Sequence, residues 1–143
     1  MGKITIEEGL KRNGFHISTI VGDSMMPMLR NRRDAVRIVP VKGVLNKYDL
    51  PLYKRPTGEY VLHRIVKVKK EYYVICGDNR FFREKVPFDW VVGVTEAIYR
   101  DDKEVSVQSP EYQSYVKKIC RTFWIRRIKR KLKNDWLKKL HKK

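Results

Sequence analysis

The chain has 143 residues, with 33 Lys and Arg against 16 Asp and Glu, which gives a formal net charge of +17. This length is enough for one domain with an appended element and is too short for two domains of ordinary size. The positive charge favours an anionic binding partner. Two cysteines, Cys76 and Cys120, are too few for a disulfide framework or a four-ligand zinc site, so both are predicted to be reduced thiols. No apolar run reaches the roughly 18 to 20 residues that cross a bilayer, and the N-terminus lacks the apolar core of a signal peptide. A cytoplasmic protein is therefore expected.

The positive charge is concentrated at the C-terminal end. Residues 117–143 contain 13 Lys and Arg and a single acid, Asp135, for a charge of +12, whereas the first 116 residues carry only +5. This asymmetry predicts a mildly basic main domain over residues 1–110 and a basic tail over residues 111–143.

Short strands dominate the main domain. Residues 5–13 are predicted as a helix, because Thr5 and Glu8 fit a capping box and Gly14 follows as a C-terminal stop. Residues 15–21 then form a strand that leads into Ser24, ahead of Pro27, which suits the first turn of a helix. Further strands are predicted over residues 35–39, 49–54, 60–69, 71–76, 90–99 with Gly93 as a bulge, and 104–107. This pattern is typical of a mostly β fold.

The tail is predicted to be helical after Pro110. At 100° per residue, one sector collects Ile125, Ile128, Leu132, Trp136 and Leu140, surrounded by Lys and Arg. Another side collects Tyr115, Ile119 and Phe123. We therefore expect a break near Phe123, with the first part packed on the domain.

The second part, residues 124–140, is typical of a helix in an anionic membrane interface, and packing on a protein partner or on its own domain is the alternative. Nucleic acid is less favoured, since the aromatic residues lie on the apolar face.

Three separated motifs carry candidate chemistry: Gly22-Asp23-Ser24-Met25 with Pro27, Leu62-His63-Arg64-Ile65, and Gly77-Asp78-Asn79-Arg80. Taken singly, Ser24 or Asp23 would cap a short helix and His63 would be a buried core histidine. Taken together, in this order and spacing, the motifs resemble the signal peptidase family of serine endopeptidases, whose superfamily includes the self-cleaving LexA-type repressors. The resemblance covers about residues 15–99.

This resemblance implies that Ser24 is the nucleophile and that its backbone N–H donates to the oxyanion. Some family members add a serine hydroxyl two positions earlier, where this chain has Gly22. His63 stands where most bacterial members have a lysine base, as in the endoplasmic-reticulum and archaeal enzymes. An imidazole, with an ordinary pKa near 6.5, is suited to accept a proton at neutral pH without a large shift.

The third catalytic residue has two candidates. Counting along the family motif brings Glu84 to the place where the histidine-type enzymes carry Asp, and Asp78 lies within the motif itself. Either carboxylate could instead form a turn or pair with Arg80 or Arg83. The sequence leaves the choice open.

The resemblance also implies a curled β fold with a shallow groove that binds an extended peptide by strand addition, with small side chains near the scissile bond. The substrate-binding residues expected from it are Gly22, Met25, Pro27, Leu50 and Leu52. This chemistry requires no metal and no organic cofactor.

The function expected from this resemblance is a serine endopeptidase that cleaves a leader or signal-like segment from a peptide or protein. Family members usually have a transmembrane anchor, and this chain shows none, so we expect it in the cytoplasm or at the inner membrane surface, held there by its tail. A catalytically inert relative that acts as a membrane-surface or partner-binding module is the alternative. A LexA-like regulator is disfavoured, since an N-terminal segment of about 20 residues is too short for a helix-turn-helix.

Overall fold

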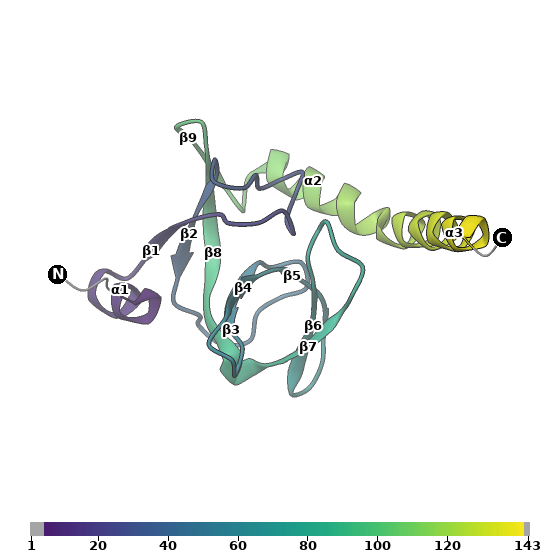
Figure 1. The fold of residues 1–143 in the computed structure, drawn as a ribbon. Coiled ribbons are helices and arrows are strands. Elements are labelled where there is room, and N and C mark those ends of the chain that lie inside the picture. The colour runs from purple at the N-terminus through teal and green to yellow at the C-terminus, as the bar shows by residue number, and fades with distance from the viewer. Residues whose placement is uncertain (1–4, 142–143) are drawn as a thin grey trace.

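The structure is a computed structural model that describes residues 5–141 apart from the side chain of Trp124, so the outermost parts of the predicted domain and tail, residues 1–4 and 142–143, lie outside the described residues. Figure 1 shows the course of the chain. Its elements are α1 (Ile6–Asn13), β1 (His16–Thr19), β2 (Ala35–Val39), β3 (Pro51–Lys54), β4 (Tyr60–Leu62), β5 (Arg64–Val68), β6 (Tyr72–Cys76), β7 (Glu84–Pro87), the short 3₁₀ helix η1 (Phe88–Trp90), β8 (Val91–Arg100), β9 (Lys103–Ser106), α2 (Pro110–Arg121) and α3 (Phe123–His141).

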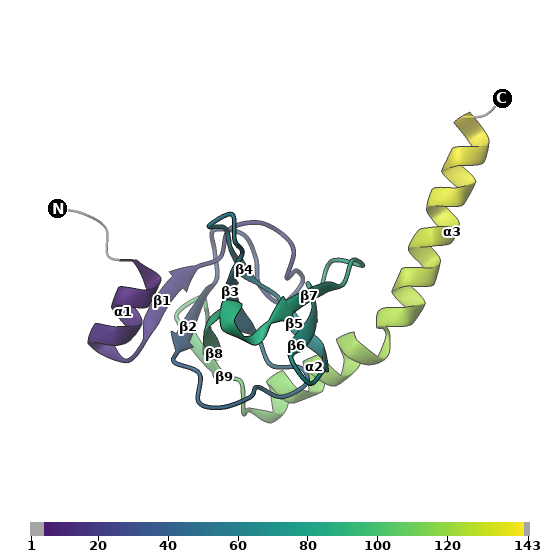
Figure 2. The same ribbon diagram turned by 90° about the horizontal axis from the view of Figure 1, so that it is seen from below.

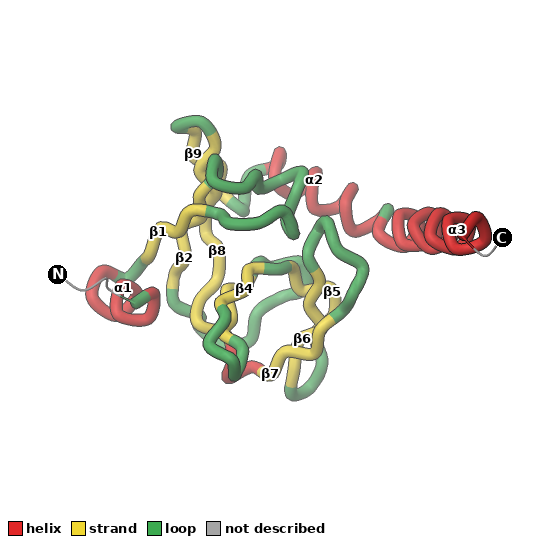
Figure 3. The backbone as a smooth tube through the Cα atoms, viewed as in Figure 1, coloured by secondary structure: helices red, strands yellow, loops and turns green. Residues whose placement is uncertain are grey.

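The strands form two antiparallel sheets. The larger sheet has the order β1-β2-β8-β3-β4, with β9 also paired to β8, and the smaller one has the order β5-β6-β7. The predicted bulge near Gly93 is confirmed, since the register of β3 on β8 shifts there, and a Cβ on Gly93 would lie 2.5 Å from Ile38 Cγ2. Figure 3 shows the strands curving round toward one another, which confirms the mostly β, curled fold with an N-terminal helix and a C-terminal helical segment.

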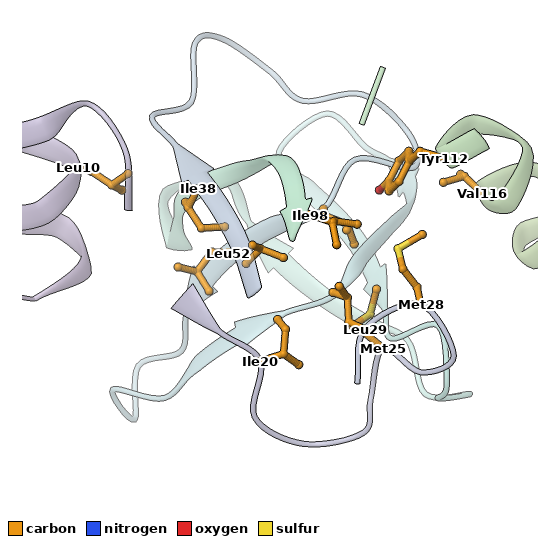
Figure 4. Packing of buried hydrophobic residues seen from close by; sticks show 12 residues of the cluster. Leu10, Ile20, Met25, Met28, Leu29, Ile38, Leu52, Ile98, Tyr112 and Val116 are labelled. Atoms are coloured by element: carbon orange, nitrogen blue, oxygen red, sulfur yellow. The ribbon is translucent and has the colours of Figure 1, made fainter. Parts of the chain in front are cut away.

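Two apolar clusters fill the fold. The one that supports the candidate site joins elements from the whole chain (Figure 4). Its buried members include Leu10 of α1, Met25, Met28 and Leu29 of the β1–β2 loop, Ile38 and Ile98 of the sheet, and Tyr112 and Val116 of α2. Burial of such side chains is the main favourable contribution to folding. The loop that carries Ser24 is therefore anchored in the core.

The predicted first helix is confirmed in detail. Thr5 Oγ1 accepts a hydrogen bond from the Glu8 N–H at 3.1 Å, and the Glu8 carboxylate accepts from the Thr5 N–H at 3.4 Å, which completes the capping box. Gly14 ends the helix in the left-handed region, with φ of 78°.

The prediction of one strand over residues 60–69 was wrong. The chain forms β4 up to Leu62, leaves the larger sheet at His63, and starts β5 of the smaller sheet at Arg64. Arg64 and Ile65 are consecutive and both buried, which a strand with a single buried face cannot provide. The alternation of side chains that the sequence predicts along residues 60–69 continues across His63, so it does not indicate that the chain passes there from one sheet to the other. Strand β7 was missed because it is short and only its Val86 is fully buried.

The expected helix start at Ser24 and Pro27 was also wrong. Residues 22–29 form bends and turns, in which the Met26 N–H donates to Asp23 O and the Leu29 N–H donates to Met25 O. Because Met25, Met28 and Leu29 all enter the core, their side chains hold the segment as a folded loop.

The predicted break in the C-terminal helix is confirmed at Thr122, between α2 and α3. Helix α2 lies against the core through Tyr112 and Val116, whereas α3 extends away from the body of the fold (Figure 2). Within residues 5–141, no helix combines the length and the apolar character needed to cross a membrane.

Candidate active site

Ser24 lies in the β1–β2 loop, which is held at both ends. At its base the Ile20 N–H donates to Asp34 O at 2.9 Å, and the Arg32 N–H donates to Ile20 O at 2.7 Å. Next to Ser24, the Gly22 N–H donates to Asn31 Oδ1 at 2.8 Å, and Met25 is only 2% exposed. These contacts give the serine a defined position although it lies in no regular element.

The β6–β7 loop, residues 77–83, closes on this serine from the other side. The Asn79 N–H donates to Ser24 O at 2.8 Å, and Asn79 Nδ2 donates to Asp23 O at 3.0 Å. Arg80 Nη2 pairs with Asp23 Oδ1 at 2.6 Å. The first and third motifs of the sequence therefore form one structural unit.

His63 lies against the same loop. A Cβ placed on Gly77 would be 2.7 Å from Ser24 O and 3.2 Å from His63 Cδ2, so both residues pack on the Gly77 backbone. Ser24 and His63 also line the same groove, whose volume is about 440 Å³. Among the described residues, neither the Ser24 side chain nor its backbone N–H makes an intramolecular hydrogen bond, and His63 makes none either. The hydroxyl, the amide and the imidazole are thus available to a ligand in the groove.

Two sheet edges flank this groove. Strands β1 and β4 end the path of the larger sheet, and in the described part of the chain each pairs on one side only. The four antiparallel pairings between them make β1 parallel to β4, so β1 runs toward Ser24 while β4 runs toward His63. Residues 18–25 and 59–63 line the groove along these edges. An extended peptide could pair with either edge.

His63 is neutral at pH 7. Its burial lowers the pKa of the imidazole to about 4, with a further lowering by the nearby Arg55 charge and a smaller opposing effect from Glu84. A neutral imidazole is the form that accepts a proton from a hydroxyl.

Glu84 begins β7 and is held by two partners. Tyr53 Oη donates to Glu84 Oε1 at 2.6 Å, and Arg55 donates to both carboxylate oxygens, at 2.9 and 3.0 Å. Burial raises the pKa of Glu84, but the hydrogen bonds from Arg55 and Tyr53 outweigh it and lower the pKa overall. The ring of Tyr53 meets the His63 ring edge-on, with centroids 6.5 Å apart. Glu84 is therefore ionised and is linked to His63 through the Tyr53 ring.

Asp78 is engaged elsewhere. Arg64 binds it with two hydrogen bonds, Nε to Oδ1 at 2.7 Å and Nη2 to Oδ2 at 2.9 Å, and Tyr115 Oη donates to Oδ2 at 3.0 Å. Arg64 and Asp78 are 1% and 4% exposed. Asp78 thus compensates a buried guanidinium on the side of the β6–β7 loop that faces α2. Neither Asp78 nor Glu84 lines the groove.

The expected substrate-binding residues divide into two groups. Gly22, Met25 and Leu52 line the groove, whereas Leu50 is 1% exposed within the core and Pro27 lines a different cavity, beside α2. The sequence interpretation missed the roles of Tyr53 and Arg55. Both lie in or just after the predicted strand 49–54, and no local signal marks them, because their contact with Glu84 depends on the pairing of distant strands.

In the described part of the chain, no cluster of three or more His, Cys, Asp or Glu side chains is arranged to hold a metal ion. In comparisons with known proteins, the chain matches no family model and no curated protein.

Proposed function

We propose that this protein is a serine endopeptidase of the signal peptidase type, which cleaves a leader or signal-like segment from a peptide or protein. The observation that carries the proposal is that Ser24 and His63, from distant parts of the chain, both pack against the Gly77 backbone and line one groove. The resemblance of the three motifs to that family assigns the same two residues as nucleophile and base.

In the proposed reaction, Ser24 Oγ attacks the carbonyl carbon of the scissile peptide bond while an imidazole nitrogen of His63 takes the hydroxyl proton. The Ser24 N–H donates to the oxyanion of the tetrahedral intermediate. When the C–N bond breaks, the imidazolium returns the proton to the leaving amine, and an acyl-enzyme remains on Ser24. A water molecule, deprotonated by His63, then hydrolyses this ester and regenerates the serine.

The substrate is proposed to be an extended segment lying between the free edges of β1 and β4. Backbone hydrogen bonds to an edge strand hold a peptide irrespective of its side chains, and pockets along the groove select among them. Glu84 is proposed to support His63 indirectly, since it offsets the Arg55 charge that lowers the pKa of the imidazole. Asp78 is proposed to have a structural role.

The proposal is tested by treating the protein with a fluorophosphonate probe, which reacts with activated serines, and measuring its intact mass. We expect one adduct, located by peptide mapping at Ser24 and absent from Ser24→Ala. Ser18→Ala is the matched control, because Ser18 also lines the groove, and it should be labelled like the wild type. A folded wild-type protein that remains unlabelled, with or without lipid vesicles, would contradict the proposal and favour the inert, partner-binding alternative.

The role of Glu84 is tested by Glu84→Gln. Removal of this charge leaves Arg55 less compensated beside His63 and lowers the imidazole pKa further, so the base weakens and labelling at neutral pH should slow by about tenfold. Glu59 is the second acidic partner of Arg55; its exposed carboxylate lies 2.7 Å from Arg55 Nη1. Glu59→Gln removes that carboxylate and should change the labelling rate by less than about twofold. Equal rates for the two variants would remove Glu84 from the mechanism.

A further inference from the structure

Helix α3 presents an uncovered apolar face. It extends away from the fold (Figures 1 and 2). One side of it exposes large apolar residues of the kind that are usually buried in a protein core. Leu132 is 64% exposed and Trp136 is 60% exposed. Together with three further exposed residues they form a continuous band along the helix. We call this band the apolar stripe; it consists of Ile125, Ile128, Leu132, Trp136 and Leu140. Within residues 5–141 nothing covers this stripe.

The charges around the stripe restrict what can cover it. Helix α3 contains eight Lys and Arg and one acid, Asp135, for a formal charge of +7. A second copy would bring an equally cationic helix against the first, and the like charges would repel. A nucleic acid would neutralise the lysines and arginines but would leave the stripe in water. An anionic bilayer satisfies both features, because acyl chains take the stripe and phosphate headgroups take the cations.

We propose that α3 docks on the surface of an anionic lipid bilayer, with its axis along the membrane and the apolar stripe among the acyl chains. The lysines and arginines beside the stripe reach back to the headgroups with their long side chains. Each cation near an anionic surface adds to the attraction, which weakens as salt screens it.

The base of α3 is joined to the loop that holds Ser24 in place. Arg126 Nη1 donates to Asp78 O at 2.7 Å, and its Nη2 donates to Ile119 O at 3.0 Å. Phe123 is 8% exposed and lies beneath the guanidinium groups of Arg83 and Arg126. Docking of α3 would therefore set the position of the β6–β7 loop, and with it the groove, relative to the membrane. If the protein has the proposed peptidase activity, on which this step rests, its substrates are peptide segments that are presented at an anionic membrane surface.

Co-sedimentation with vesicles tests the docking. We compare vesicles of phosphatidylcholine alone with vesicles of phosphatidylcholine and phosphatidylglycerol in equal amounts, and expect the wild type to bind the anionic vesicles and to be released by high salt. The double variant Leu132→Gln/Trp136→Gln should lose at least about tenfold in partitioning, because it removes the largest exposed part of the stripe. Asn134→Gln lies on the opposite face of the helix and should bind as the wild type does. Circular dichroism verifies that each variant keeps its helix content.

Several results would overturn the proposal. One is failure of the wild type to bind anionic vesicles, and another is equal binding by the double variant. A third is a concentration-dependent dimer in sedimentation that the double variant abolishes, which would identify a second copy of the chain as the occupant of the stripe. Binding of duplex DNA that outcompetes vesicles and is unchanged in the double variant would assign the helix to nucleic acid. Ser24→Ala should bind vesicles normally, so failure of the docking and failure of the peptidase proposal are observed separately.

Discussion

Replacing His63 with alanine is expected to slow the modification of Ser24 by the fluorophosphonate probe by about 10³-fold at neutral pH, while the fold is retained. The reason is that a serine hydroxyl is a poor nucleophile until a neighbouring base takes its proton. His63 packs on the same Gly77 backbone as Ser24, and burial lowers its pKa so that it is neutral at pH 7, which is why we propose it as the base. The measurement is the second-order rate constant of labelling, followed by intact mass.

His141→Ala is the control for this prediction, because His141 is exposed at the end of α3 and should leave the rate unchanged. A rate for His63→Ala within a few-fold of the wild type would show that another group activates the serine. Loss of labelling in both variants would point to a general effect of histidine replacement.

The same assignment fixes the pH dependence of the wild type. The base works in its neutral form, and the pKa of His63 is lowered to about 4, so the labelling rate should be high at neutral pH and should fall as the pH drops through about 4. An unperturbed imidazole would instead lose activity near its ordinary value of 6.5. Because the unfolded chain binds this proton at higher pH than the folded one, His63 also makes the fold less stable as the pH falls from 6.5 toward 4. Stability is therefore measured alongside the rate.

Replacing Asp78 with alanine is expected to lower the free energy of unfolding by about 3–5 kcal/mol, the largest effect on stability that we predict. Arg64 would remain 1% exposed with its charge uncompensated, since Asp78 accepts two of its hydrogen bonds. Tyr115 would lose its acceptor as well. Urea denaturation followed by fluorescence measures the change.

Glu59→Gln serves as the comparison for this loss. It breaks the exposed ion pair with Arg55, and an exposed pair of this kind contributes less than about 1 kcal/mol. Similar small losses in both variants would mean that the Arg64–Asp78 pair does not stabilise the fold. If the Asp78→Ala protein remains fully stable but inactive, Asp78 regains its place as a candidate catalytic residue.

Local sequence signals predicted the elements that local physics stabilises. Thr5, Glu8 and Gly14 marked both ends of α1, because capping depends on residues within one turn of the helix end. The apolar residues lie on one side of the helix up to Phe123 and on a different side from Ile125 onward, and this change marked the break between α2 and α3. The concentration of positive charge in the tail was likewise visible in the sequence, since net charge does not depend on the fold.

What the sequence did not predict is what requires distant strands to meet. The strand predicted over residues 60–69 divides at His63 because β4 and β5 belong to different sheets, and alternation along one segment does not report which sheet it joins. The same applies to the two carboxylates that the sequence left open. Only pairing of β6 with β7 and of β3 with β4 brings Glu84 to Tyr53 and Arg55, and only the packing of the β6–β7 loop over Arg64 draws Asp78 toward α2.

The sequence by itself thus determined the helical ends, the mostly β character, the basic tail, and Ser24 and His63 as candidate residues. The tertiary structure decided that these two residues share a groove and that the two candidate carboxylates, Glu84 and Asp78, each have an arginine and a tyrosine as partners. The physical reason is that capping, alternation and charge act over a few residues, whereas the environment of a titratable group is created by whichever chain segments the fold packs around it.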